Sequence, residues 1–267
     1  MQYSALITGA SSGLGAETAK IFKSRNCRVY GTSRKRESGE VADGITWIKL
    51  DLLVPESIEE ACSYIQKNIP HLNCIIHNAG IGFLGAAMDS KSAAFQQLFQ
   101  TNVSGVAHFN AGLSKYILAH KPKLLFVSSI AGTFGLNYRA AYVASKHALE
   151  GYAKSLRMEL KESGVTVQLV SPGDVKTKIA NSRLVLEPKP GSPFHLPFNR
   201  VVKKIDEEVK AGLKPEEVAK EIFKIAINGG KRFKYIIAKP LQKLSILLYH
   251  AVPYGWFENL VIRHYNQ

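Results

Sequence analysis

The chain has 267 residues, and its content of 46% hydrophobic and 21% charged residues is typical of a globular protein with a substantial core. Lysine and arginine outnumber aspartate and glutamate by 35 to 21, a formal net charge of +14 that favours anionic partners, but no recognisable nucleic-acid module accompanies them, so we expect no nucleic-acid binding. The three cysteines, Cys27, Cys62 and Cys74, have neither paired nor metal-ligand spacing, which argues against a disulfide framework or a metal site and indicates a reducing, cytoplasmic location.

Short apolar, β-branched runs alternate with helical patterns from the beginning of the chain. The first run starts so early that we expect no secretion signal. This alternation predicts an α/β fold: a Rossmann-like, doubly wound parallel sheet in a single domain with a C-terminal extension. Strands are expected at 3–8, 28–32, 45–50, 73–77, 123–129 and 165–171, and helices near 14–25, 56–68, 92–120, 138–163 and 215–228, followed by a strand at 233–238.

The stretch TGASSGLG, Thr8 to Gly15, joins the first strand to the first helix. Its glycines at 9, 13 and 15 allow a tight turn and close approach of the backbone to a pyrophosphate, which the N-terminus of the following helix attracts. At the first strand-to-helix junction of a doubly wound chain, this pattern predicts a dinucleotide site.

The end of the second strand carries Ser33 and Arg34 where enzymes that use NAD usually carry an acid. A hydroxyl and a guanidinium would hold a 2'-phosphate through charge-assisted hydrogen bonds, so NADP(H) is favoured over the alternative that Arg34 to Arg36 are only solvated loop charges. Asp51, after the third strand, could accept a hydrogen bond from the adenine amino group or cap a helix.

Tyr142 and Lys146 lie four residues apart in a helical pattern, so their head groups share one side of the helix. A free phenol has a pKa near 10 and exchanges protons poorly at neutral pH unless a nearby cation stabilises its anion. Lys146 is placed to supply that cation, which indicates that Tyr142 is an acid and base catalyst.

Further motifs stand at fixed distances from these two. The triplet Asn78, Ala79 and Gly80 follows the fourth strand, Asn102 lies within TNVSG, Ser129 precedes Tyr142 by thirteen residues, and Pro172 and Gly173 are followed by Thr177. With the glycine loop and the Tyr-Lys pair, they closely resemble the short-chain dehydrogenase/reductase family, and the resemblance extends to about residue 235.

The resemblance implies an oxidoreductase that interconverts a carbonyl group and an alcohol. Tyr142 would donate a proton to the carbonyl oxygen while hydride arrives from the nicotinamide, and Ser129 would stabilise the charge that develops on that oxygen. Lys146 would also hold the nicotinamide ribose, and Asn102 would anchor a water that leads to solvent. The cofactor residues implied are Thr8, Gly9, Ser11, Ser12, Gly13, Leu14, Gly15, Ser33, Arg34, Asp51, Leu52, Asn78, Ala79, Gly80, Tyr142, Lys146, Pro172, Gly173, Val175 and Thr177.

One position departs from the family pattern: His77 stands where the family more often has asparagine before the Asn-Ala-Gly triplet. We expect its side chain near the adenosine half of the cofactor, with altered packing and no loss of activity.

Residues 178–212 are rich in Pro, Gly and Phe and too long for an ordinary connection, so we expect a substrate lid loop within a catalytic domain spanning residues 1–237. An apolar pocket suited to a steroid, retinoid or long-chain acyl ketone would be lined by Phe134, Leu136, Leu184, Leu186, Phe194, Leu196 and Phe198.

Residues 238–267 form an apolar C-terminal extension. Leu241, Leu244, Leu247 and Leu248 make an approximate helical stripe beside Lys239, Lys243 and His250, which could pack on the domain, on a subunit or on a membrane surface. Its apolar runs are far shorter than the roughly 20 residues that span a bilayer.

Three functional classes follow. An NADP(H)-dependent oxidoreductase for a hydrophobic substrate is favoured by the complete Asn-Ser-Tyr-Lys set. A 3-oxoacyl carrier protein reductase is allowed by the positive charge and disfavoured by the C-terminal extension. A non-catalytic NADP(H)-sensing scaffold would be expected to carry a damaged catalytic set. The family resemblance also implies a homodimer or homotetramer that contacts through the helices near 92–120 and 138–163.

Overall fold

The apolar runs of the sequence form the strands of one eight-stranded sheet, and the computed structural model describes residues 2–90, 92–176 and 183–266. All neighbouring strands pair in parallel except β3, which is antiparallel to β4. Every residue of β1 is buried, as continuous apolar strands covered on both faces require. In spatial order the strands are β10 (Lys234–Ile237), β8 (Val167–Pro172), β7 (Lys123–Val127), β5 (Cys74–His77), β1 (Ser4–Ile7), β2 (Arg28–Ser33), β4 (Ile45–Lys49) and β3 (Val41–Ala42).

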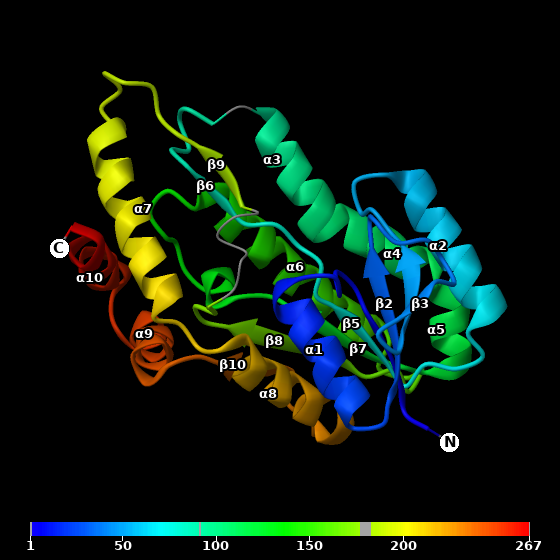
Figure 1. Cartoon of the computed structure of the whole chain (residues 1–267). Helices are drawn as coiled ribbons and strands as arrows, with labels where there is room; N and C mark the ends of the chain where they lie inside the picture. The colour runs from blue at the N-terminus through cyan, green and yellow to red at the C-terminus, as the bar shows by residue number, and fades with distance from the viewer. Residues whose placement is uncertain (1, 91, 177–182, 267) are drawn as a thin grey trace.

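Helices cover both faces of the sheet, which confirms the predicted Rossmann-like, doubly wound fold (Figure 1). One face packs against α2 (Pro55–Asn68), α4 (Gly105–Gly112), α5 (Ser114–His120) and α6 (Ala140–Glu159). The other packs against α1 (Gly13–Ser24) and α8 (Pro215–Asn228), which meet edge to face through Phe22 and Phe223 with ring centroids 4.9 Å apart.

The strand order reverses direction at β1, which pairs with β2 on one side and β5 on the other. At such a switch point the loops that follow the two strands diverge and leave a crevice at the carboxyl edge of the sheet. The glycine loop follows β1 and the Asn78 triplet follows β5, so the fold brings these two motifs to the same crevice.

The helix expected at 92–120 is divided into α3 (Ser92–Phe99), a π-helical turn at Gln100–Ser104, α4 and α5. A Cβ at Gly105 would stand 2.4 Å from the carbonyl oxygen of Leu52, so only glycine permits this close approach. π-turns of this kind are common at functional sites, and this one contains Asn102.

The segment 178–212 has more regular structure than a lid loop. Of its described part, β9 (Leu184–Leu186) pairs in parallel with β6 (Phe83–Gly85), and α7 (His195–Lys210) is a sixteen-residue helix. The helix buries Phe198, Val201 and Ile205 as an apolar stripe. Composition alone did not reveal α7 because the stripe is short and preceded by prolines.

The C-terminal extension forms two helices, α9 (Pro240–Ala251) and α10 (Tyr254–Asn266), beside α7 (Figure 1). Ile246 and Phe257 pack on Phe134, and Tyr265 packs in the cluster around Phe198. The opposite faces of these two helices leave large apolar side chains exposed. None of the helices in the described ranges combines the length and hydropathy that a bilayer-spanning segment requires.

Candidate active site

Two adjoining cavities of about 190 Å³ and about 210 Å³ occupy the carboxyl edge of the sheet at the switch point. They share the lining residues Leu14, Asn78, Gly80 and Ile81, so they form one continuous groove. We call the cavity beside Tyr142 the reaction cavity and the one beside Arg34 the adenosine cavity.

The glycine loop lines the adenosine cavity, and its Leu14 also lines the reaction cavity. Gly9 has φ +67°, and a Cβ at Gly15 would lie 2.3 Å from the Gly9 carbonyl oxygen, so both positions need glycine. The hydroxyl of Thr8 accepts hydrogen bonds from the backbone N–H groups of Asn78 (3.0 Å) and Ala79 (2.9 Å), which fixes the loop after β1 to the loop after β5.

Helix α1 begins at Gly13, and its N-cap residue Ser12 makes no side-chain capping bond. The free N–H groups of the first turn and the positive end of the helix dipole are therefore available to an anion. Gly9, Ser11, Ser12 and Leu14 all line the groove.

Ser33 and Arg34 line the adenosine cavity, with Ser33 buried and Arg34 exposed. Ser33 is held in place by the backbone N–H of Lys35, which donates to its hydroxyl at 3.2 Å. In contrast, Arg36 is ion-paired with Glu40 and does not line the cavity. The three neighbouring basic residues thus have different environments, and Arg34 is the arginine at the groove.

Asp51 and Leu52 also line the adenosine cavity. One carboxylate oxygen of Asp51 accepts a hydrogen bond from the backbone N–H of Leu53 at 3.0 Å. The structure therefore shows a local turn contact for Asp51, while its place in the cavity lining leaves it within reach of a ligand.

Ser129, Tyr142 and Lys146 come together in the lining of the reaction cavity, together with Pro172, Gly173 and Val175. Ser129 follows β7 and caps the 3-10 turn Ile130–Gly132 by accepting from the Ala131 N–H at 3.2 Å. Tyr142 and Lys146 project from α6, and the Lys146 Nζ donates to the Val127 carbonyl at 3.1 Å. Strand and helix thus present the three side chains to one space.

Asn102 is buried directly behind this set and lines neither cavity. Its Oδ1 accepts from the Ile81 N–H at 2.9 Å, and its Nδ2 donates to the Ile81 carbonyl at 3.0 Å and to Ser145 Oγ at 3.1 Å. Asn102 therefore fixes the loop after β5 to helix α6.

Burial dominates the electrostatics of the two α6 residues. It raises the pKa of Tyr142, against which the side-chain hydrogen bond with Ser129 and the charge of Arg139 act. It lowers the pKa of Lys146 to about 8, while the negative charge of Glu150 acts in the opposite direction. Since burial alone would raise the pKa of Tyr142, the surrounding polar and charged groups must lower it if the phenol is to release its proton.

The apolar pocket expected from the sequence is wrong in its residues. None of Phe134, Leu136, Leu184, Leu186, Phe194, Leu196 and Phe198 lines the reaction cavity; its apolar side chains include Ile81, Phe83, Leu84, Ile205 and Val209. Phe134 packs on Phe257, Phe198 is in the α7 core, and Leu196 is 73% exposed. The sequence places apolar segments near the site, but it does not show which side chains of these segments face the cavity. That depends on the tertiary structure.

Three charged residues of the reaction cavity have no counterpart among the expected site residues: Arg139, Asp174 and Arg183. Burial raises the pKa of Asp174, which accepts a hydrogen bond from Gln242 of α9 at 2.6 Å. Arg183 is ion-paired with Asp206 of α7. In the sequence, the one indication that Arg139 and Asp174 belong to the site is that they lie close to Tyr142 and Gly173, respectively. Thr177, expected to bind the carboxamide, lies outside the described residues.

His77 does not lie near the adenosine cavity. It is buried in the core, stacked on Phe126 with ring centroids 4.5 Å apart, and is not among the residues that line that cavity. Burial lowers the pKa of His77 to about 3, so the side chain is neutral in the folded protein.

A family profile described as "short chain dehydrogenase" matches residues 3–185. The chain is 32% identical to the uncharacterized oxidoreductase YusZ of Bacillus subtilis, over 96% of each chain. It is 31% identical to the 3-ketodihydrosphingosine reductase of Bacteroides thetaiotaomicron, over 90% of this chain and 89% of that protein.

Solved structures of low sequence identity share the fold. A short-chain dehydrogenase from Burkholderia cenocepacia in complex with NADP has a TM-score of 0.75 at 21% identity, covering 98% of this chain and 99% of that one. A relative from Burkholderia phymatum in complex with NAD has a TM-score of 0.79 at 22% identity, covering 94% and 93%.

Proposed function

The chain belongs to the short-chain dehydrogenase family, and from this premise we propose that it is an NADP(H)-dependent oxidoreductase that interconverts a hydrophobic ketone or aldehyde and its alcohol. The observation that carries the proposal is that Ser129, Tyr142 and Lys146 line one cavity that continues into the groove over the glycine loop. A carbonyl group in that cavity would lie beside a proton donor and at the end of a dinucleotide-shaped groove.

The residues of the groove fit a dinucleotide. Because Gly9 and Gly15 have no side chains, phosphate groups can approach the backbone closely there. The N-terminus of α1 provides N–H donors for them. Tyr142, Lys146, Pro172, Gly173 and Val175 surround the opposite end, where a nicotinamide ring would lie. The cofactor, when bound, supplies or accepts the hydride.

Arg34 and Ser33 favour NADP(H) over NAD(H). A guanidinium and a hydroxyl at this end of the groove are suited to a 2'-phosphate, and among the residues that line the adenosine cavity the one acid is Asp51. The fold is shared by relatives with either cofactor, so the preference depends on these two residues.

In the reducing direction, Tyr142 donates its proton to the carbonyl oxygen, and Ser129 donates a hydrogen bond to the same oxygen. The positive charge of Lys146 favours the tyrosinate that this step leaves. Asn102 holds the loop after β5 against α6, and the remaining acceptor position of its Oδ1 could hold a water for proton return.

The reaction cavity suits a molecule with an apolar body and a polar group. Phe83, Leu84, Ile205 and Val209 offer apolar surface, and Arg139 and Asp174 add charge near Tyr142. The similarity to the 3-ketodihydrosphingosine reductase of Bacteroides thetaiotaomicron supports a lipid-like substrate over a small one. Steroid and retinoid ketones remain within the same class.

Two other functions are less well supported. A reductase for acyl groups on a carrier protein is allowed by the net charge of +14, but helices α9 and α10 stand beside α7, whose Ile205 and Val209 line the reaction cavity (Figure 1). A scaffold that only senses NADP(H) would not need Ser129, Tyr142 and Lys146 together in one cavity.

We also propose that the protein is cytoplasmic and that its C-terminal extension contacts the surface of a membrane. Leu241, Leu244 and Leu247 are 71%, 46% and 64% exposed on one side of α9, and Lys243 is exposed beside them. Apolar side chains flanked by lysine are typical of helices that lie in the interface of an anionic bilayer. A homodimer or homotetramer formed through α4 and α6 would leave this surface free.

The test is to follow NADPH and NADH absorbance with a panel of steroid, retinoid and acyl-chain ketones, using the wild type and Tyr142→Phe. We expect oxidation of NADPH by the wild type with at least one lipid-like ketone, and a loss of roughly 10²-fold or more in kcat for Tyr142→Phe. Turnover that survives this substitution would exclude Tyr142 as the proton donor.

A further inference from the structure

Glu150 is a buried carboxylate that no step of the proposed mechanism uses. It lies on α6 one turn after Lys146, is 4% exposed, and faces the sheet. A buried charge is costly unless it is paired and fully hydrogen-bonded, so its presence calls for an explanation. A Cβ at Gly132 would stand 2.5 Å from one carboxylate oxygen, which shows how tightly the turn after Ser129 packs on this group.

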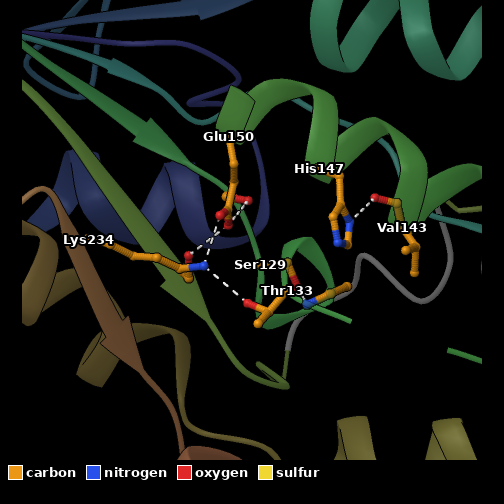
Figure 2. Close-up of polar contacts among 9 residues, drawn as sticks. Ser129, Thr133, Val143, His147, Glu150 and Lys234 are labelled. Atoms are coloured by element: carbon orange, nitrogen blue, oxygen red, sulfur yellow. Dashed lines mark hydrogen bonds and ion pairs between the residues drawn. The ribbon is translucent and has the colours of Figure 1, made fainter. Parts of the chain in front are cut away.

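The two oxygens of Glu150 hold several elements together. Oε1 accepts from the hydroxyls of Ser128 at 3.1 Å and Ser171 at 3.3 Å, which belong to the ends of β7 and β8. Oε2 accepts from Nζ of Lys234 on β10 at 2.8 Å, and the same ammonium donates to Thr133 Oγ1 at 3.1 Å. Figure 2 shows Glu150 and Lys234 pointing toward each other from α6 and β10, with Thr133 next to the ammonium.

Each of these contacts lies next to a residue of the active site. Ser128 precedes Ser129, and Thr133 follows the short turn that Ser129 caps. Ser171 comes two residues before Gly173, which lines the reaction cavity. One carboxylate therefore connects the segment bearing the serine, the turn at Gly173 and the helix bearing Tyr142 and Lys146.

The charge of Glu150 also acts on Lys146. Burial favours the neutral amine of Lys146, and the carboxylate one turn away favours the ammonium. Lys234 on β10 is the cation paired to that carboxylate, so it limits how much of the negative charge Lys146 experiences. Among the residues that line the reaction cavity, the other charged or titratable groups are Tyr142 on α6, Arg139 before α6 and Asp174 after β8, together with Arg183, which is paired with Asp206.

We propose that Glu150 and Lys234 form a positioning pair that holds Ser129 in register with Tyr142, in which the carboxylate of Glu150 keeps Lys146 in its charged form and Lys234 moderates that effect. The proposal rests on the proposed function, because it assigns Glu150 a role through Lys146 and Ser129. Glu150 itself lines neither the reaction cavity nor the adenosine cavity.

The test compares Glu150→Gln and Lys234→Met with the wild type in the pH dependence of kcat for NADPH-dependent ketone reduction. Glutamine keeps an acceptor for the two serines but removes the charge and leaves Lys234 unbalanced. Lys146 would then lose its proton at lower pH, so we expect the alkaline limb of the profile to move down by about one pH unit, a tenfold loss of rate on that limb. Lys234→Met leaves the carboxylate of Glu150 without its cation, so the alkaline limb should move to higher pH.

A direct readout separates this proposal from the function itself. The ¹³Cε resonance of Lys146, assigned with Lys146→Met, is titrated in the protein without cofactor, and its midpoint should move in the same two directions. If the wild type proves inactive on every ketone, the proposed function fails while this titration still decides the role of the pair. Midpoints that stay in place, or that move the same way in both variants, would overturn the proposal, and Lys234→Met decides alone if Glu150→Gln does not fold.

Discussion

The Lys146 ammonium lies 5.8 Å from the centre of the Tyr142 ring, one turn along α6 and within the same buried environment. A positive charge in such a buried environment favours the phenolate over the neutral phenol. The spacing of four residues in the sequence is thus realised as an electrostatic pair. Substitution of Lys146 or of Tyr142 should therefore lower kcat.

Ser129→Ala should lower kcat by about 10²-fold, because the hydroxyl that stabilises the developing oxyanion is lost. KM for NADPH should change little, since Ser129 lines only the reaction cavity. Steady-state kinetics with saturating ketone measures both constants. Ser128→Ala removes a neighbouring hydroxyl that donates to Glu150, so its loss in kcat should be smaller, and an equal loss for the two would contradict a direct role of Ser129.

Arg34→Asp should weaken NADPH binding by about 10²-fold while NADH binding is affected much less, because an acid repels the 2'-phosphate and can bind the ribose hydroxyls. Titration of intrinsic fluorescence with each cofactor gives both dissociation constants. Arg36→Asp serves as the matched control, since Arg36 is paired with Glu40 away from the groove. Equal losses for NADPH and NADH would remove Arg34 from 2'-phosphate recognition.

Arg139→Gln should raise the pKa of Tyr142, because the charge of Arg139 now lowers it. In the oxidising direction Tyr142 acts as a base and must be deprotonated, so the acid limb of the kcat profile should move to higher pH. The profile for alcohol oxidation is measured from about pH 6 to about pH 10. Arg139→Lys keeps the charge and should leave the limb near its wild-type position; the same displacement in both variants would argue against a charge effect.

His77 should make the protein less stable in acid. Its folded-state pKa is lowered to about 3, so between roughly pH 6.5 and pH 3 the unfolded chain binds a proton that the native state does not. The free energy of unfolding therefore falls as pH falls through this range, by up to about 1.4 kcal/mol per unit from this group. Urea unfolding of His77→Asn and wild type at several pH values should show a shallower dependence for the variant, and parallel curves would contradict it.

The exposed stripe of α9 should be needed for vesicle binding. Wild-type protein is expected to sediment with vesicles of phosphatidylcholine and phosphatidylserine and to be released by salt, whereas Leu244→Gln combined with Leu247→Gln should stay in the supernatant. Leu118→Gln is the control, because Leu118 is 48% exposed on α5, outside the stripe. If the double variant instead changes only the oligomeric state in sedimentation velocity, the stripe is a contact between subunits.

Much of the fold could be predicted because apolar runs such as Cys74–His77 are short, β-branched and separated by helical patterns. Buried parallel strands are recognisable in a sequence as short continuous apolar runs of this kind. The segment after residue 178 was harder, because β9 forms only by pairing with β6, about a hundred residues earlier in the chain. No local pattern reports such a pairing.

The site divides in the same manner. Tyr142, Lys146 and Ser129 are marked by fixed spacings, and the fold places them in one cavity. The substrate wall depends on tertiary packing: Phe198 and Ile205 belong to the same buried stripe of α7, but of the two Ile205, two turns later, also lines the cavity. The role of Glu150 was also invisible, because its partners come from three strands and a turn.

Gln242 of α9 donates to Asp174 at 2.6 Å, and a Cβ at Gly173 would strike its amide oxygen. Helix α9 therefore packs directly on two residues that line the reaction cavity. Exchange of residues 238–266 with those of a relative would reshape the entrance while Ser129, Tyr142 and Lys146 keep their places, so substrate range in this protein can diverge independently of its proton chemistry.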